Sequence, residues 1–340
     1  MEALRIEGGA RLSGEVTVNG SKNAALPMMA ASLLTREKVT LHNVPQLMDV
    51  DTMTLILLEL GVRPLWVDDH TLELQVEDEK RTAASFDLVR QMRASICVMG
   101  PLLARRKRAQ VPLPGGCVIG VRPVDLHIKG LRALGARVDT ERGDLVAEAE
   151  ELRGDEMYLG GLYGSTVLGT CNVLMAAVLA QGVTVIDDAA CEPEVQELCH
   201  MLNRMGARVS GIGTKRLVIE GVKDLHGVEH AVIPDRIEAA TLLAAGAITR
   251  GDMLVRGCRR DHVGAVLDAF ARMGVQVKPE GEDALRVRAP GGFRATDLAT
   301  LPYPGLPTDV QAQMMALLSL ADGARSEERR VGKECSLLCR

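Results

Sequence analysis

The residues of this chain best suited to chemistry lie in one loop, PLPGGCVIGVRPVD, at positions 112–125. Its prolines and glycines exclude a helix and predict a loop whose backbone can approach a ligand closely. Cys117 follows the glycine pair, and Arg122 comes five residues later, a setting in which a thiol can be exposed and its pKa lowered. A free cysteine is more often a small buried hydrophobic residue. We expect that state for the cysteines in apolar segments, Cys97, Cys171, Cys199 and Cys258.

Basic residues are expected at the starts of three similar helices. Lys22, Arg93 and Arg236 fall in the first turn of these segments. A helix N-terminus already carries a partial positive charge, so a cation there is mildly unfavourable on its own. Each side chain could simply extend into water. Recurrence at equivalent positions instead favours a site for a strongly anionic ligand such as phosphate, pyrophosphate or carboxylate.

The elements that must position these residues form a repeat. Five nearly wholly apolar segments predict buried helices, at 22–38, 93–108, 169–182, 235–251 and 308–323. A short β-rich strand follows four of them, and then an amphipathic second helix. The second helices end at Gly61, Gly135, Gly206 and Gly274, which are 74, 71 and 68 positions apart. This period is too long for a solenoid and predicts an α/β protein whose buried helices form cores surrounded by sheets.

The composition is that of a soluble globular protein with room for about two domains. Of the 340 residues, 47% are apolar and 25% charged, while the aromatic content of 2% argues against base-stacking platforms for nucleic acid. The net charge of −5 gives no reason to expect a polyanion partner, and Arg105, Arg106, Lys107 and Arg108 predict a solvated turn.

The cellular setting follows from what the chain lacks. No apolar run reaches the ~18 residues of a membrane span, and the first residues have no signal-peptide pattern. Eight cysteines without paired spacing are typical of reduced thiols. We therefore expect a cytoplasmic protein without membrane insertion, and infer no obligate protein partner.

Six motifs occur in an order that resembles a known family. They are SKNAALP at 21–27, NVP at 43–45, MRASI at 92–96, LPGGCVIGVRPVDLH at 113–127, PDRIE at 234–238 and LPTDVQAQ at 306–313. Together they resemble the UDP-N-acetylglucosamine 1-carboxyvinyltransferases, enolpyruvyl transferases of peptidoglycan synthesis, over residues 1 to about 324. The resemblance implies an inside-out α/β barrel of two domains built from βαβαββ units. It places the first domain at 22–233, and an incomplete second domain at 1–21 and 234–324.

The resemblance also implies a role for individual residues. Lys22 and Asn23 match the pair that holds phosphoenolpyruvate, and Arg122 matches an arginine on the same substrate. Cys117 matches the loop cysteine that protonates the enol carbon and can form a covalent adduct. A thiol suits both tasks because its pKa lies near working pH. The sugar nucleotide would be bound by Arg93 and by the run Pro123, Val124, Asp125 and Leu126.

Two further sites are implied in the same way. Ser165, Thr166 and Val167 fall where the family makes backbone contacts to the diphosphate, although this chain reads STVLG in place of the usual SVGAT. Asp309 matches the carboxylate beside the sugar hydroxyl that attacks. It could also be a helix N-cap partner of Thr308.

The implied reaction is an addition–elimination in which the sugar 3-hydroxyl adds to C2 of phosphoenolpyruvate and phosphate then leaves. Lysine and arginine handle the charge, so no metal and no cofactor are expected. A shikimate-pathway enolpyruvyl transferase and a non-catalytic sugar-nucleotide-binding protein are the alternatives. The GGC loop and the RPVDLH segment argue against the shikimate-pathway enzyme, because that family lacks this cysteine loop. Measured turnover would exclude the non-catalytic binding protein.

The last residues depart from the repeat. The fifth buried helix should be followed by a strand and an amphipathic helix, but residues 325–340 read RSEERRVGKECSLLCR, without a sustained period. We expect a non-native tail there, because the sixth unit of the family pattern and its arginine are missing. On this interpretation the chain as written has an exposed apolar surface, low solubility and little turnover.

Overall fold

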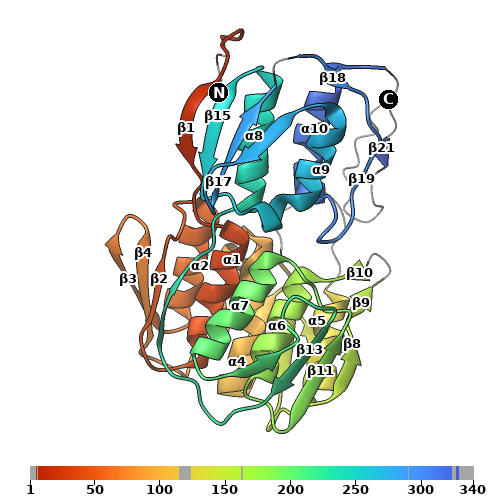
Figure 1. Cartoon of the computed structure of the whole chain (residues 1–340). Helices are drawn as coiled ribbons and strands as arrows, with labels where there is room; N and C mark the ends of the chain where they lie inside the picture. Colours follow the sequence, from red (N-terminus) through yellow and green to blue (C-terminus); the bar gives the residue numbers. More distant parts are fainter. Residues whose placement is uncertain are drawn as a thin grey trace. The chain divides into compact units, whose positions relative to one another are not determined.

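The computed structural model describes residue 5 and residues 7–114, 124–161, 164–289, 291–323 and 327–328. They form two compact units. The large unit consists of the described residues within 20–233, and the small unit of the described residues up to 19 together with those from 234 to 328. In Figure 1 the large unit is coloured from red-orange to green, and the small unit has a red first strand and teal to blue elements.

Three helices buried on nearly all sides form the core of the large unit. They are α1 (Lys22–Ala31, continued by η1, Ser32–Leu34), α4 (Met99–Arg106, preceded by η2, Arg93–Val98) and α6 (Val167–Ala177). α1 and α4 both contact α6. Their residues are mostly alanine, leucine, methionine and valine, since almost no face reaches water.

One predicted helix begins differently from expectation. Residues 93–98 form a 3-10 helix, and the α-helix starts only at Met99. Pro101, which has no N–H to donate, is the third residue of α4 and so lies in its first turn, where a proline removes no intrahelical hydrogen bond.

Each core helix leads into a strand, a second helix and a hairpin. α1 is followed by β2 (Val39–His42), α2 (Met48–Glu59), β3 (Val62–Asp68) and β4 (Thr71–Val76). α4 is followed by β5 (Arg108–Pro112), α5 (Asp125–Ala133), β6 (Arg137–Glu141) and β7 (Asp144–Glu148). α6 is followed by β11 (Val183–Asp187), α7 (Pro193–Arg204), β12 (Arg208–Ser210) and β13 (Arg216–Glu220). A hairpin thus follows each second helix of this unit.

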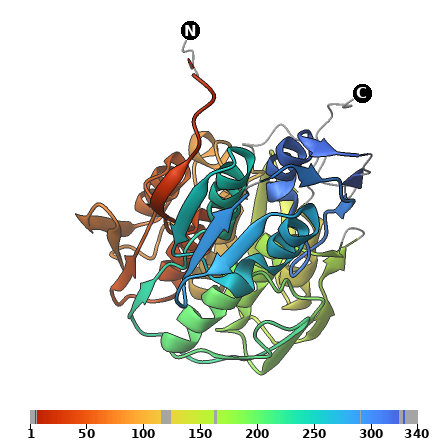
Figure 2. The same ribbon diagram turned by 45° about the horizontal axis from the view of Figure 1, so that its top comes forward.

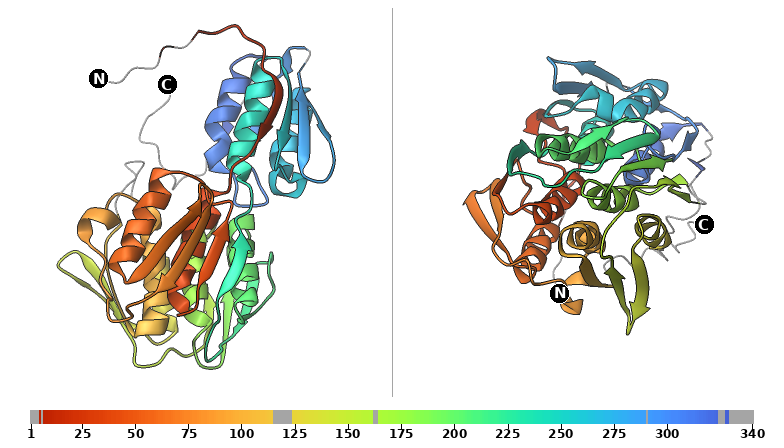
Figure 3. Two further views of the ribbon diagram at one scale, coloured as in Figure 1. Left: turned by 90° about the vertical axis from the view of Figure 1, so that its left-hand side faces the viewer. Right: turned by 90° about the horizontal axis from the view of Figure 1, so that it is seen from below.

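Three sheets enclose these helices. With β14 (Val228–Ala231) and β8 (Glu156–Tyr158), their orders are β14-β2-β4-β3, β5-β7-β6 and β12-β13-β11-β8. The hairpin strands β3–β4, β6–β7 and β12–β13 pair antiparallel, whereas β14–β2 and β11–β8 are parallel. Figure 3 (right) shows the helices of this unit inside and its strands at the periphery. The predicted core of helices surrounded by sheets is confirmed for this unit.

The repeated glycines have a common backbone role. Gly61, Gly135, Gly206 and Gly274 have φ values of 81°, 90°, 100° and 86°. Each follows a second helix, so each ends it in the left-handed conformation that glycine adopts without a Cβ penalty. The helix endings that define the repeat are therefore termination signals.

The small unit begins with β1 (Ser13–Thr17), which pairs parallel with β15 (Asp252–Arg256) in the sheet β1-β15-β17-β16 (Figures 1 and 2). The other strands are β16 (Gln276–Pro279) and β17 (Ala284–Arg288). α8 (Arg236–Ile248) packs on this sheet, and α9 (Gly264–Met273) follows η3 (Arg260–Val263). The core includes Leu243, Val255, Phe270 and Leu317.

The fifth predicted helix lies in the same unit. It consists of η4 (Thr308–Val310) and α10 (Gln311–Leu318), and α10 packs beside α8 (Figure 3, left). β18 (Phe293–Arg294) pairs with β20 (Ala321–Asp322). β19 (Leu298–Ala299) pairs with β21 (Glu327–Glu328), which lies in the segment expected to be a tail.

The basic cluster at 105–108 spans the end of α4, its C-cap Lys107 and the start of β5, so the prediction of a solvated turn was wrong for Arg105 and Arg106. Arg105 is only 19% exposed and binds Glu79 at 3.0 Å, and Arg106 donates to the carbonyl of Leu60 at 2.7 Å. Hydrogen bonds from Arg36 and Arg105 hold the pKa of Glu79 at about 2. The arginines tie α4 to neighbouring loops, a role that local sequence does not reveal.

Candidate active site

The start of α1 carries a lysine paired with an acid from the next helix. Lys22 is the first residue of α1, and its Nζ lies 2.9 Å from Oδ2 of Asp49, in the first turn of α2. Both side chains are partly exposed, at 39% and 34%. An ammonium has three donors, so the pair leaves Lys22 able to bind an anion as well. The neighbouring Asn23 is exposed.

The backbone before α1 is held in place by the NVP motif. Asn43 has a φ of 55°, and its amide donates to the carbonyl of Val232 at 2.9 Å. Gly20 packs so tightly on this residue that a Cβ there would lie 1.8 Å from the Asn43 carbonyl oxygen. Ser21 donates its N–H to Ile233 at 2.7 Å. These contacts fix the backbone position from which the Lys22 side chain extends.

A buried histidine and a buried amide connect three segments of the large unit. The Oδ1 of Asn172 in α6 accepts from the Gly100 N–H at 2.6 Å, which leaves its Nδ2 to donate. Nδ2 donates to the carbonyl of Ile96 at 2.9 Å and to Nδ1 of His127 at 3.0 Å. With Nδ1 accepting, the proton of the imidazole is on Nε2.

The charge state of His127 follows from its surroundings. Burial, and to a lesser extent the charge of Arg93, lowers the pKa of His127 to about 3. The imidazole is therefore neutral at physiological pH. The network holds η2, α5 and α6 together where three of the predicted binding segments lie.

The segments predicted to bind the sugar nucleotide are brought near one another. Asp125 is the exposed first residue of α5, with Val124 at its N-cap. Leu126 lies against the short strand β9 (Gly160–Gly161), since a Cβ on Gly161 would be 3.1 Å from its Cδ1. β9 pairs with β10 (Gly164–Ser165), which leads directly into α6.

The start of α6 is suited to an anion. Thr166 is its N-cap and accepts from the Gly169 N–H at 3.2 Å, and Val167 is its first residue. The N–H groups of a first helical turn and the helix dipole favour negative charge. Lys215, just before β13, lies 3.5 Å from the Ser165 hydroxyl through its Nζ.

The third helix-start cation belongs to the small unit. Arg236 is the first residue of α8, and its predecessor Asp235 caps the helix by accepting from the N–H groups of Ile237 and Glu238, at 2.7 and 3.2 Å. Glu238 in turn accepts from the backbone N–H and the side chain of Asn19, both at 2.8 Å. The PDRIE motif is thus a capping arrangement that also holds the exit of β1.

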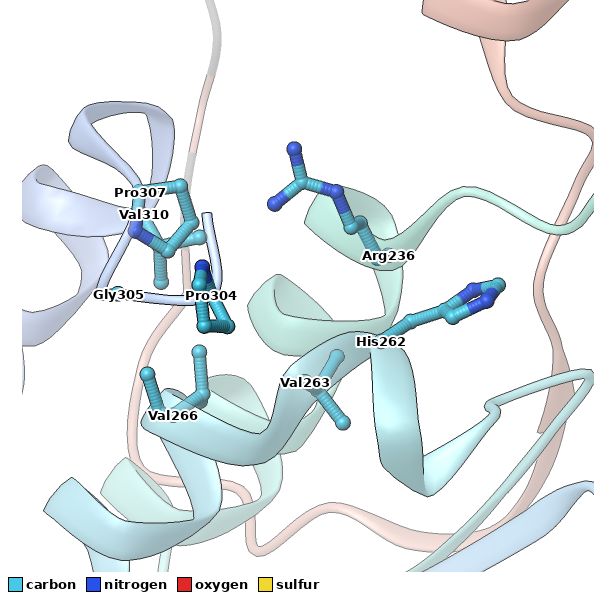
Figure 4. A pocket seen from close by; sticks show the side chains of 9 residues that line it. Arg236, His262, Val263, Val266, Pro304, Gly305, Pro307 and Val310 are labelled. Carbon is cyan, nitrogen blue, oxygen red and sulfur yellow. The ribbon is translucent and has the colours of Figure 1, made fainter. Parts of the chain in front are cut away.

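A small open depression lies beside Arg236 (Figure 4). Its walls come from η3, α9 and the 304–310 segment, and include His262, Val263, Val266, Pro304, Pro307 and Val310. The Arg236 guanidinium lies 5.6 Å from the centre of the Tyr303 ring, a cation–π distance.

Asp309 lies in η4 at the edge of this region and is exposed. The alternative that it caps the helix start together with Thr308 is wrong. Pro307 and Val310 take the cap positions of η4 and α10, and neither makes a side-chain cap bond. The exposed carboxylate is therefore not used for helix capping.

Three predicted site residues, Cys117, Arg122 and Pro123, lie outside the described residues. The cysteines expected to be inert are indeed buried. Burial raises the pKa of Cys97, Cys199 and Cys258 to about 12, and that of Cys171 well above its usual value. None of these thiols is suited to be a nucleophile or a proton donor at neutral pH.

Sequence reasoning missed Asp49, His127, Asn172 and Lys215. Only His127 had a nearby signal, because it ends the RPVDLH motif. Within the described ranges, no three metal-ligating side chains gather in one place. No helix in the described part of the chain is long and apolar enough to cross a membrane.

Comparison with known proteins identifies the family to which the chain belongs. Residues 6–334 match the EPSP synthase (3-phosphoshikimate 1-carboxyvinyltransferase) family. A UDP-N-acetylglucosamine 1-carboxyvinyltransferase of Methylacidiphilum infernorum is 49% identical over 323 residues, which is 95% of this chain and 76% of that protein. UDP-N-acetylglucosamine 1-carboxyvinyltransferase 1 of Staphylococcus aureus strain MRSA252 is 48% identical over 326 residues, with the same coverage.

Solved structures agree on the fold. The enolpyruvyl transferase NikO from Streptomyces tendae superimposes with a TM-score of 0.84 at 22% identity, covering 96% of this chain and 78% of NikO. EPSP synthase from Acinetobacter baumannii gives 0.70 at 16% identity, covering 94% and 74%. The chain therefore belongs to the EPSP synthase family of carboxyvinyltransferases and has the enolpyruvyl transferase fold.

Proposed function

We propose that the chain transfers the enolpyruvyl group of phosphoenolpyruvate to the 3-hydroxyl of UDP-N-acetylglucosamine and releases phosphate. The observation that carries this proposal is the 48–49% identity, over 95% of the chain, to relatives named for that reaction. On this view the protein acts in the cytoplasm, in peptidoglycan synthesis.

The large unit supplies groups that suit both substrates. Lys22 and Asn23, with Arg122, hold phosphoenolpyruvate, and Asp49 orients the Lys22 ammonium through the 2.9 Å ion pair. The sugar nucleotide lies along Pro123, Val124, Asp125 and Leu126, with Arg93 beside it. Its diphosphate faces the start of α6 at Ser165, Thr166 and Val167.

The reaction proceeds in two steps. In the addition, Asp309 accepts the proton of the sugar 3-hydroxyl as its oxygen bonds to C2 of phosphoenolpyruvate, and the Cys117 thiol gives a proton to C3. In the elimination, the Cys117 thiolate takes a proton from C3 as the C2–O bond to phosphate breaks, which restores the double bond and the thiol, and the departing phosphate takes up the proton held by Asp309. The cations Lys22 and Arg122 stabilise the negative charge on the departing phosphate.

The family description leaves the shikimate-pathway reaction as the alternative. It is less well supported, because the EPSP synthase structures share only 16–17% identity with this chain. Calorimetric titration of the 340-residue protein with each acceptor distinguishes the two. We expect binding of UDP-N-acetylglucosamine and none of shikimate 3-phosphate, and the reverse result would overturn the proposal.

A further inference from the structure

One lysine of the large unit lies at the start of α6 without belonging to any motif. Lys215 stands between β12 and β13, and its Nζ is 2.7 Å from Oδ1 of Asp188 and 3.5 Å from Oγ of Ser165. Ser165 is the last residue of β10, two positions before α6 begins. An ammonium group is thus held next to the helix N-terminus by side chains from two other segments.

The position of this ammonium is fixed by several contacts. The Ala189 N–H donates to the carbonyl of Lys215 at 3.0 Å, which joins the lysine's backbone to the segment that carries Asp188. A Cβ on Gly160 would lie 2.3 Å from Oδ2 of Asp188, so β9 passes directly over the acid. The next residue, Arg216, binds both oxygens of Asp187 at 2.7 Å. The lysine therefore has a defined place rather than a freely moving side chain.

Exposure and charge leave the ammonium available to a ligand. The Lys215 side chain is 54% exposed, whereas the Asp188 side chain is 18% exposed. Of the three ammonium donors, the contacts to Asp188 and Ser165 use two, so one remains for an acceptor arriving from solvent. The hydrogen bond to Asp188 raises the pKa of Lys215, which keeps the group charged at any working pH.

We propose that Lys215 donates to the diphosphate of the bound sugar nucleotide, together with the N–H groups at the start of α6. This inference rests on the proposed function, which brings the diphosphate to Ser165, Thr166 and Val167. Asp188 positions the ammonium and also partly offsets its charge. The pair therefore sets how strongly this part of the site attracts an anion.

An alternative is that the lysine only braces the segment around Asp188. The two roles predict different effects of two substitutions. If Lys215 binds the diphosphate, Lys215→Ala weakens binding, whereas Asp188→Asn removes a competing negative charge and leaves binding unchanged or tighter. If the pair is only a brace, both variants weaken binding alike. Asparagine suits position 188, because the residue has a φ of 54° and asparagine adopts the left-handed conformation readily.

The experiment is calorimetric titration of the full chain with UDP-N-acetylglucosamine and with UDP, for the parent, Lys215→Ala, Lys215→Arg and Asp188→Asn. Lys38→Ala is a matched control, because Lys38 is 52% exposed and also paired with an acid, Glu73, in the β14-β2-β4-β3 sheet. Thermal unfolding of each variant checks that folding is retained.

We expect Lys215→Ala to weaken binding of both ligands about tenfold, as for one charge-assisted hydrogen bond. Lys215→Arg and Lys38→Ala should bind like the parent, and Asp188→Asn at least as tightly. If Lys215→Ala matches Lys38→Ala while the parent binds UDP-N-acetylglucosamine, the inference fails and the proposed function stands. If Lys215→Ala and Asp188→Asn weaken ligand binding equally, the inference is overturned and the Lys215–Asp188 ion pair has only a structural role. A parent that binds neither ligand overturns both proposals.

Discussion

The environment of Lys22 shows how a neighbouring side chain modifies the binding properties of a single residue. Its type and helix-start position predicted an anion ligand, and the structure adds a partner, Asp49, 2.9 Å away. That partner was not predictable, because it comes from the first turn of a different helix and matches no local pattern. Asp49 orients the ammonium and also reduces its net attraction for an anion.

If Lys22 holds phosphoenolpyruvate, Lys22→Ala should weaken that substrate's binding at least tenfold. One charge-assisted hydrogen bond is worth about 1.5–3 kcal/mol, and partial exposure puts the effect toward the lower value. Binding is measured by calorimetry and folding by thermal unfolding, with Lys38→Ala as the control. Unchanged affinity in Lys22→Ala would place the anion site elsewhere.

The sequence alone sets Cys117 apart from Cys97, Cys199 and Cys258, because it follows a glycine pair in a predicted loop, whereas the raised pKa values of those three buried cysteines make them unreactive. If Cys117 is the loop acid, the epoxide fosfomycin should alkylate it selectively, and Cys117→Asp should keep an acid while removing the alkylation. Peptide mass mapping of the treated protein locates the adduct. Labelling of the other cysteines with Cys117 untouched would refute this assignment.

His127 should make stability depend on pH. Its folded pKa of about 3 lies below the unfolded value of about 6.5, so below pH 6.5 the unfolded state binds the extra proton. Stability is therefore fully present above pH 6.5 and falls as the pH drops toward 3, by at most about 1.4 kcal/mol per pH unit. Urea unfolding between pH 7 and 4 should show a smaller loss for His127→Gln than for the parent. Equal losses would show that His127 is protonated in the folded state.

At the scale of the elements, the sequence predicted best where one residue type determines one conformation. The glycines that end the second helices were identified from the repeat, and all four have positive φ. The sequence predicted poorly where long side chains reach other segments. The basic run at 105–108 was predicted to be a solvated turn, yet Arg105 forms an ion pair with Glu79 and is mostly buried. Sequence spacing gives no information about such contacts.

Two of the repeat glycines make a matched test of this termination role. A Cβ at Gly61 would lie 2.2 Å from the Asp78 carbonyl oxygen, whereas at Gly135 nothing lies within 4 Å. Gly135→Ala should cost about 1–2 kcal/mol of unfolding free energy, for the left-handed backbone alone. Gly61→Ala should cost about 1–3 kcal/mol more, because the backbone must also move. Urea denaturation measures both, and equal costs would contradict the account.

At the scale of the whole molecule, the succession of core helix, strand and second helix in the large unit could be predicted because the repeat appears three times within it, whereas the hairpin after each second helix could not be predicted from the repeat. The binding segments could be named only through the family resemblance, since STVLG or PVDL alone specifies no ligand. Lys215 could not have been found, because an isolated turn lysine has no pattern. It becomes notable only when folding brings it to Ser165, 3.5 Å away.

The central claim is that this chain uses UDP-N-acetylglucosamine as the acceptor of an enolpyruvyl group. The most direct measurement is phosphate release from phosphoenolpyruvate, at protein concentrations high enough to register a single turnover. UDP-N-acetylglucosamine, shikimate 3-phosphate or no acceptor is added in parallel. The account predicts release that requires UDP-N-acetylglucosamine and is absent with shikimate 3-phosphate, whatever the rate. Release that requires shikimate 3-phosphate, or no release above the acceptor-free control, would contradict it.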